Sequence, residues 1–167
     1  MQLGLTWPLQ RRLKVSVPYG EAIECGLCWD AHCITLLGRS SLLLVHCASR
    51  YTCVRYDLSV WDWSRLEELA FEEIRQGLLD AGIPEKQVSS YLKKAGEIQM
   101  TRTHGRREVA FLNRAWEDVL SADLLIDKSN HRQPILNHSV NDRLCRCAGE
   151  DGIDTAHAHL MRYFNDR

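Results

Sequence analysis

Residues 101–107, which read T-R-T-H-G-R-R, hold the side chains with the clearest chemical potential in this sequence. They place three guanidiniums, one imidazole and two hydroxyls within seven positions. Guanidinium groups bind oxyanions through paired N–H donors, and an imidazole can transfer a proton near neutral pH. The segment joins a strand-like stretch to a helical pattern, so backbone N–H groups at the helix start would serve the same site. The sequence therefore predicts an anion-binding site here.

The predicted site divides into residues that bind and residues that move a proton. The predicted binding residues are Thr101, Arg102, Thr103, Arg106, Arg107 and Asn113. On a helix that begins near residue 104, Arg106 and Asn113 lie seven residues apart and share a face. His104 is the predicted general acid or base, with Glu97 as its carboxylate partner.

Three functions fit this pattern. The first is a binding module for a phosphate-bearing partner, nucleic acid being the best candidate, with Lys93 and Lys94 adding positive charge. The second is a phosphate- or phosphodiester-cleaving enzyme that uses His104, although no metal-binding carboxylate cluster or second base is evident. The third is a protein-interaction domain that uses the acidic helix expected over residues 62–80. In that last case the arginines form a solvated face that pairs with acidic residues.

The cysteines and histidines give weaker signals. Cys25-x-x-Cys28 could join Cys145-x-Cys147 or a histidine around zinc, but the second pair lacks a standard spacing. A row of Cys33, His46 and Cys53 on the expected sheet is another candidate. His157 and His159 lie two apart, so on a helix they point in different directions and cannot share an ion. Because unpaired cysteines are commonly buried apolar residues, we predict no metal and no cofactor.

Length and composition place the chain among ordinary globular proteins. Its 167 residues are 45% hydrophobic and 26% charged, with a net charge of −1, and favour a single domain over residues 1–167. Residues 61–80 carry six acids and two bases, whereas residues 86–114 carry seven bases and two acids. The apolar runs are too short to span a membrane, and the N-terminal stretch lacks a signal-peptide pattern. These observations predict a protein without a membrane partner. The seven cysteines are an odd number and no signal peptide is evident, so the sequence also predicts reduced thiols and a cytoplasmic location.

A three-stranded antiparallel meander is expected over residues 31–56. Residues 31–37, 42–48 and 51–56 are strand-like, and two-residue loops at Arg39-Ser40 and Ser49-Arg50 would join them. One face then carries a continuous apolar set that forms the core: Ile34, Leu36, Leu43, Val45, Val54 and Tyr56. The other face is mixed and partly covered.

Helices are expected over four further stretches, residues 62–81, 84–94, 104–120 and 154–164. Asp62 or Ser64 caps the first, and residues 97–103 alternate like a strand. A short strand and helix precede residue 15, with Thr6 as N-cap and Pro8 in the first turn. Residues 121–152 are polar and possess no clear pattern. The predicted class is α+β, an antiparallel sheet of three or more strands with three to five helices packed mainly on one face.

The order of several short motifs resembles a family of small uncharacterised bacterial proteins, a domain of unknown function. The shared motifs are W-x-A at 29–31, a hairpin with Arg39, S-R-Y at 49–51, A-G-E at 95–97, the 101–107 segment and L-N at 112–113. The resemblance covers about residues 1–120. It implies no activity, but it supports the same positions as the site. This chain departs from the family pattern at Asp30, His32 and Gly105, where the family has His, Asn and Asp.

Overall fold

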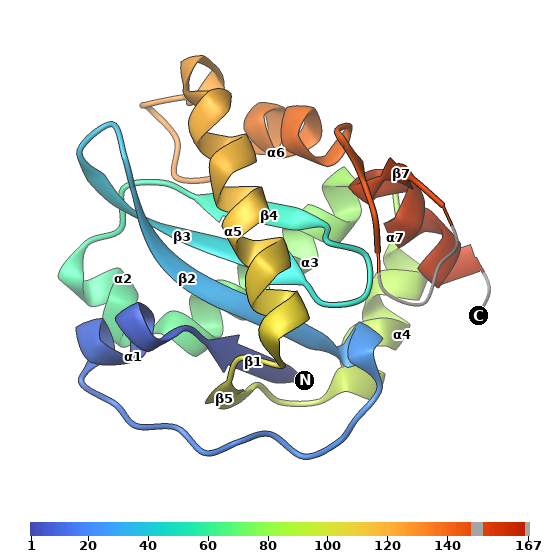
Figure 1. Cartoon of the computed structure of the whole chain (residues 1–167), viewed down its shortest axis with the longest axis horizontal. Coiled ribbons are helices and arrows are strands. Elements are labelled where there is room, and N and C mark those ends of the chain that lie inside the picture. Colours follow the sequence, from blue (N-terminus) through green and yellow to red (C-terminus); the bar gives the residue numbers. More distant parts are fainter. Residues whose placement is uncertain (148–151, 166–167) are drawn as a thin grey trace.

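The structure is a computed structural model, and it describes residues 1–147 and 152–165. A five-stranded mixed sheet forms its centre (Figure 1). The strand order is β4-β3-β2-β1-β5. The strands are β1 (Gln2–Leu5), β2 (Cys28–Leu36), β3 (Arg39–His46), β4 (Thr52–Arg55) and β5 (Gln99–Arg102). The α+β class is confirmed. The purely antiparallel sheet is wrong, because β1 runs parallel to both of its neighbours, β2 and β5.

The meander β2-β3-β4 is present with a different register from the expected one. Leu37 and Gly38, both with positive φ, form the first turn, so Leu36 pairs with Arg39 and the predicted loop at Arg39-Ser40 is wrong. A five-residue connection replaces the second predicted two-residue loop, and Leu42 pairs with Arg55. Both shifts are by an even number of residues. The side chains therefore keep the faces that the sequence predicted.

Helices cover both faces of the sheet, so the prediction of one main helical face is wrong (Figure 1). One face packs against α5 and α6, and the other packs against α3, α4 and α7. The helices are α1 (Trp7–Leu13), α2 (Val60–Ser64), α3 (Leu66–Asp80), α4 (Glu85–Ala95), α5 (Arg106–Ser121), α6 (Pro134–Asn141) and α7 (Ala156–Asn165). The described residues thus contain seven α-helices, more than predicted, and short 3-10 turns at Cys25–Leu27 and Asp123–Leu125.

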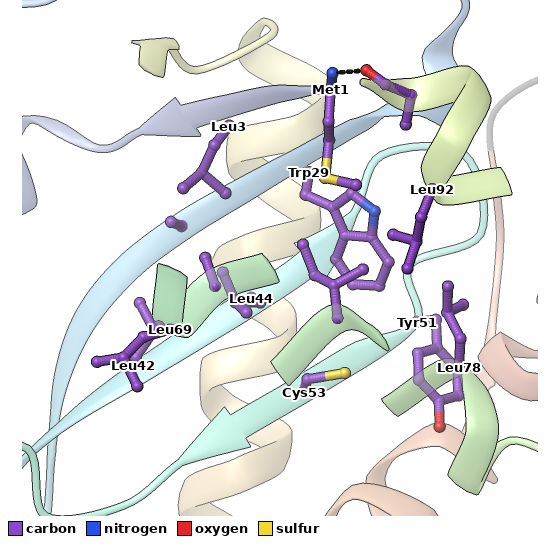
Figure 2. Close-up of a cluster of buried hydrophobic side chains, with 14 of the residues drawn as sticks. Met1, Leu3, Trp29, Leu42, Leu44, Tyr51, Cys53, Leu69, Leu78 and Leu92 are labelled. Atoms are coloured by element: carbon purple, nitrogen blue, oxygen red, sulfur yellow. Dashed lines mark hydrogen bonds between the residues drawn. The ribbon is translucent and has the colours of Figure 1, made fainter. Parts of the chain in front are cut away.

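The larger core lies on the face that the sequence suggested to be mixed. Figure 2 shows Trp29 and Leu44 of the sheet facing Leu78 and Leu92 of the helices. The Trp29 indole N–H donates to the Tyr91 hydroxyl at 2.9 Å, so the buried ring also has its polar group satisfied. Because both faces are buried, the central strands read as long apolar runs rather than as an alternating pattern.

The opposite face has the core that the sequence predicted. Ile34, Leu36, Leu43, Val45, Val54 and Tyr56 are all buried there. Leu112, Ala115 and Val119 of α5 cover these residues. The amphipathic spacing of α5 therefore fixes which way the start of this helix points, toward β1 and β5.

Residues 121–147 contain more order than their sequence pattern indicates, and residues 148–151 of the predicted irregular stretch lie outside the described residues. Asn137 and Asn141 of α6 bond to the outer edge of β4, where their Oδ1 atoms accept from the N–H groups of Val54 and Thr52 at 2.9 and 2.7 Å. Their i, i+4 spacing matches the alternate N–H groups of an edge strand. Side chains of α6 thus satisfy an edge that would otherwise be open to pairing with another chain.

Helix starts follow partly from local sequence. Ser59, rather than the predicted Asp62 or Ser64, is the N-cap of α2, and it forms a capping box with Asp62. Thr6 occupies the predicted N-cap of α1, although its hydroxyl bonds to the His32 ring at 2.7 Å instead of capping. In the part of the chain that the structure describes, no helix has the length and apolar character needed to cross a bilayer.

Candidate functional site

The site forms where β1 lies between β2 and β5. Gly4 of β1 is paired with Asp30 on one side and with Thr101 on the other. A Cβ atom at Gly4 would lie 2.0 Å from Asp30 Oδ1 and 2.9 Å from His104 Nδ1. The absence of a side chain at Gly4 therefore allows Asp30 and His104 to meet above β1, although they are 74 residues apart in sequence.

His104 is held by acceptors on both ring nitrogens. Its Nδ1 lies 2.7 Å from Asp30 Oδ1, and its Nε2 lies 3.2 Å from Gln2 Oε1. Gln2 in turn donates through Nε2 to the carbonyl of Glu21, which orients its amide oxygen toward His104. Both acceptors are satisfied when both ring nitrogens carry a proton. In that form His104 is a cation and can donate a proton to a ligand.

Asp30 is almost completely buried, with 1% of its side chain exposed. Burial raises the pKa of its carboxyl group, and the hydrogen bond and charge of His104 oppose that rise. Its Oδ2 atom has no hydrogen-bond partner among the described residues. The carboxylate therefore depends on His104 for its stabilisation, as the imidazole depends on Asp30 for its orientation.

A hollow of about 370 Å³ opens beside His104, and we call it the His104 pocket. Thr103, Arg102 and Arg107 line it, together with Cys25 and Cys28. Burial raises the pKa of both thiols, that of Cys28 to about 12, so they are protonated and poor nucleophiles at neutral pH. The two thiols are therefore poor candidates for the reactive group of this pocket, and His104 stays the predicted one.

A second hollow of about 540 Å³, the Trp7 pocket, shares Arg102 and Thr103 with the first. Arg11, Lys14 and Arg102 give it three positive charges, and no acidic residue lines it. In the His104 pocket, by contrast, Arg107 pairs with the buried Glu108, with its Nε at 2.8 Å from Glu108 Oε1. The net positive charge of the site thus lies mainly in the Trp7 pocket.

Exposed aromatic rings accompany these cations. The Arg11 guanidinium lies 4.7 Å from the centre of the Trp7 ring, and that of Arg102 lies 4.5 Å from the centre of the Tyr19 ring. Trp7 is 66% exposed and Tyr19 is 77% exposed. Each pair combines a flat π-face with a positive charge.

The structure brings together only some of the residues that the sequence predicted. His104, Arg102, Thr103 and Arg107 converge on the two pockets. Thr101 is buried, and its hydroxyl donates to the carbonyl of Arg102, so it supports the strand rather than contacting a ligand.

The remaining predicted residues lie elsewhere. Arg106 and Asn113 are exposed on α5 and line neither pocket. Glu97 is exposed before the start of β5, and the carboxylate that contacts His104 is that of Asp30. Lys94 lies on α4, and its Nζ atom pairs with Glu24 Oε2 at 2.9 Å.

Several residues of the site were missed in the sequence. These are Gln2, Gly4, Trp7, Arg11, Lys14, Tyr19 and Asp30. The three basic residues within positions 11–14, which begin four residues after Trp7, are a local signal that could have drawn attention to α1. Asp30 had no such signal, because its role depends on the pairing of β1 with both β2 and β5.

The acidic helix is only partly available to a partner. Glu73 is fully buried, and its Oε2 accepts from Arg55 Nη1 at 3.3 Å. Arg132 contacts both Glu73 and Asp80, and Glu68 pairs with Arg65 at 2.8 Å. The structure therefore assigns much of this acidic charge to internal ion pairs.

The seven cysteines form no disulfide bond with one another. The predicted row of Cys33, His46 and Cys53 is wrong, because Cys33 pairs with Leu42 and Cys53 with Leu44 in the observed register. Among the described residues, two groups of three potential metal ligands occur: Asp30 with Cys47 and His104, and Cys145 with Cys147 and His159. In the first group, Asp30 already occupies Nδ1 of His104, and burial raises the pKa of Cys47 well above its usual range.

The comparisons with known proteins identify a family but no activity. A search of curated proteins finds no match. A family model, by contrast, matches residues 2–158, which includes β1, β2, β5 and the whole candidate site. The chain therefore belongs to the family described as domain of unknown function DUF6933.

Proposed function

We propose that this chain binds single-stranded nucleic acid across the Trp7 and His104 pockets. The observation that carries the proposal is the pairing of two exposed aromatic rings with Arg11 and Arg102 around adjoining hollows. Proteins that bind single strands combine a positive groove for the phosphates with aromatic faces on which bases stack. The free thiols support a location in the reducing cytoplasm.

Each part of the surface has a distinct task in this proposal. Arg11, Lys14 and Arg102 contact phosphates in the Trp7 pocket, where no acidic residue opposes them. Trp7 and Tyr19 stack against bases on either side of Arg102. His104 offers its imidazole ring to a ligand in the neighbouring pocket. The net charge of −1 does not oppose this function, because the positive charge is local.

Fluorescence anisotropy of labelled single-stranded RNA and DNA tests the proposal. We expect binding that weakens with salt, with a slope of about −0.7 in log K against log salt for each phosphate contact. The double variant R11A/R102A should lower the magnitude of this slope by about 1.4. The control R65A/R114A removes two exposed arginines that line neither pocket, and it should leave binding unchanged.

The aromatic residues provide a second readout. W7A and Y19A should each weaken binding by about 1–3 kcal/mol with little change in the salt slope, because stacking involves no counterion release. If R11A/R102A and R65A/R114A lost the same amount of binding affinity, the result would contradict the proposal. Competition by inorganic phosphate but not by oligonucleotides would replace it with a small-anion site.

A phosphodiester-cleaving activity is the second candidate, and the Asp30–His104 pair favours it. A buried carboxylate that orients an imidazole in a pocket is the arrangement of many general acid–base sites. If the strand is cut, the anisotropy signal will decay over hours, and H104A will abolish the decay. A binding module without activity will tolerate H104A with a modest loss of affinity.

A further inference from the structure

A cluster of metal-binding side chains lies outside the candidate site, at the C-terminal end of the fold. The cluster consists of three residues: Cys145 in β6 (Leu144–Cys145), Cys147 just after this strand, and His159 in α7. Each offers one ligand atom, and the three atoms all lie within 4.8 Å of one another. All three residues are buried. We propose that they bind a zinc ion.

The donor set determines which metal is expected. Two sulfur atoms and one imidazole nitrogen suit zinc, whereas calcium and magnesium require oxygen ligands. A tetrahedral zinc ion takes four ligands. The described residues supply three, and the fourth position remains for a water molecule or another group.

The hydrogen bonds of His159 match those of a metal ligand. Its Nε2 donates to the carbonyl of Cys145 at 3.3 Å, which leaves Nδ1 as the unprotonated nitrogen. Ligating histidines usually hold their second ring nitrogen in this way. Arg162 donates to Nδ1 at 2.8 Å through Nη2, so a positive group already faces the coordinating nitrogen. An incoming ion would displace Arg162, whose Nη1 also pairs with Asp154 at 2.7 Å.

The local structure has few other sources of stability. The strands β6 and β7 (Asp154–Thr155) have two residues each. Their apolar cluster consists of Cys145, Cys147 and Ala156. A two-stranded ribbon of this length is marginal in water. A zinc ion that joins Cys145 and Cys147 to α7 would hold the ribbon against the helix, because binding energy at a structural zinc site acts as folding energy.

The other cysteine pair serves as a matched control. Cys25 and Cys28 belong to neither group of three potential ligands among the described residues. The weak zinc alternative in the sequence joined these two cysteines to Cys145, Cys147 or a histidine, whereas the prediction was no metal. In the structure His159 completes the downstream pair instead.

Titration of the purified, metal-stripped protein with Co²⁺, a spectroscopic substitute for zinc, tests the proposal. We expect one equivalent to give a tetrahedral visible spectrum and a sulfur-to-cobalt charge-transfer band, and Zn²⁺ to displace it. C145S/C147S should abolish the charge-transfer band, and H159N should weaken binding on the order of a hundredfold. C25S/C28S should behave like the wild type. Loss of the band in C25S/C28S, or its persistence in C145S/C147S, would overturn the assignment.

A second measurement requires no variant, so it remains decisive if the substitutions prevent folding. X-ray absorption of the zinc-loaded wild type should show two sulfur ligands at about 2.3 Å and one imidazole nitrogen at about 2.0 Å. Thermal unfolding should also shift upward by roughly 5–10 °C at a hundredfold excess of zinc over Kd. A wild-type protein that binds no Co²⁺ or Zn²⁺ would exclude the site.

Discussion

Two buried carboxylates, Asp30 of β2 and Glu73 of α3, show how the partner decides the role of a charge. Burial raises the pKa of both groups, and each has one oxygen without a hydrogen-bond partner among the described residues. Glu73 faces the guanidiniums of Arg55 and Arg132, which keep their charge. Asp30 faces His104, whose imidazole side chain is the predicted general acid or base.

The surroundings of the two groups differ as well. Glu73 joins α3 to β4 and to the segment before α6, and its side chain has no exposed surface. Asp30 joins β2 to the start of α5 beside the open His104 pocket, and 14% of the His104 side chain is exposed. Glu73 is thus enclosed in internal ion pairs, whereas the Asp30–His104 pair lies beside an open pocket, as the proposed function requires.

The largest predicted effect is that of removing Glu73. At pH 6, E73A should lower the free energy of unfolding by about 2–4 kcal/mol, because it leaves a cavity and removes the acceptor of Arg55. D30A should cost about 1 kcal/mol, because His104 can bond to water in the pocket. Urea unfolding followed by circular dichroism measures both values. The exposed neighbour variant E72A is the control, and a cost of E73A equal to that of E72A would refute the structural role.

The pH dependence of stability separates the two carboxylates further. Burial raises the pKa of Glu73 from 4.5 to about 7, against the opposing charges of Arg132 and Arg55. The folded state therefore prefers the protonated form, so this contribution to stability is complete below pH 4.5 and is lost as the pH rises through about 7. Between pH 4.5 and pH 7, the free energy of unfolding of E73Q should therefore rise by about 3 kcal/mol relative to that of the wild type. If the free energies of unfolding of the two proteins differed by the same amount from pH 4 to pH 8, Glu73 would have an ordinary pKa in the folded protein.

The G4A variant should lose less stability than E73A, but it should lose the contact between Asp30 and His104. The added methyl group would overlap Asp30 Oδ1, and overpacking of this kind costs about 1–3 kcal/mol. Oligonucleotide binding and any cleavage should suffer more than stability, because the side chains that must move are those of Asp30 and His104. Anisotropy and urea unfolding of the same sample compare the two losses. Normal binding by G4A would separate the Asp30–His104 pair from the ligand site.

Local patterns in the sequence predicted the elements that do not depend on distant pairing. The apolar spacing of Val109, Leu112, Trp116 and Val119 predicted a helix over residues 104–120, and α5 spans Arg106–Ser121 with Gly105 as its N-cap. The faces of the meander were also correct, since an even shift in register preserves them.

What the sequence could not predict depends on contacts between distant segments. The strands β1 and β5 have four residues each, too few to indicate that they pair in parallel. Without that pairing, Asp30 and His104 could not be brought together. Asp30 is also a position at which this chain departs from the motif of the resembling family, so the W-x-A pattern gave no indication of its role.

NMR chemical-shift mapping with a short single-stranded oligonucleotide tests the central claim most directly. We predict that amide signals from α1, residues 14–21 and residues 102–108 will shift together, with the indole signal of Trp7 and the ring signals of His104. Signals from the Glu73 group should stay unchanged, as should those of the exposed acidic residues of α3. Shifts confined to α3, or the absence of shifts at low salt, would contradict the assignment of the two pockets as the functional site.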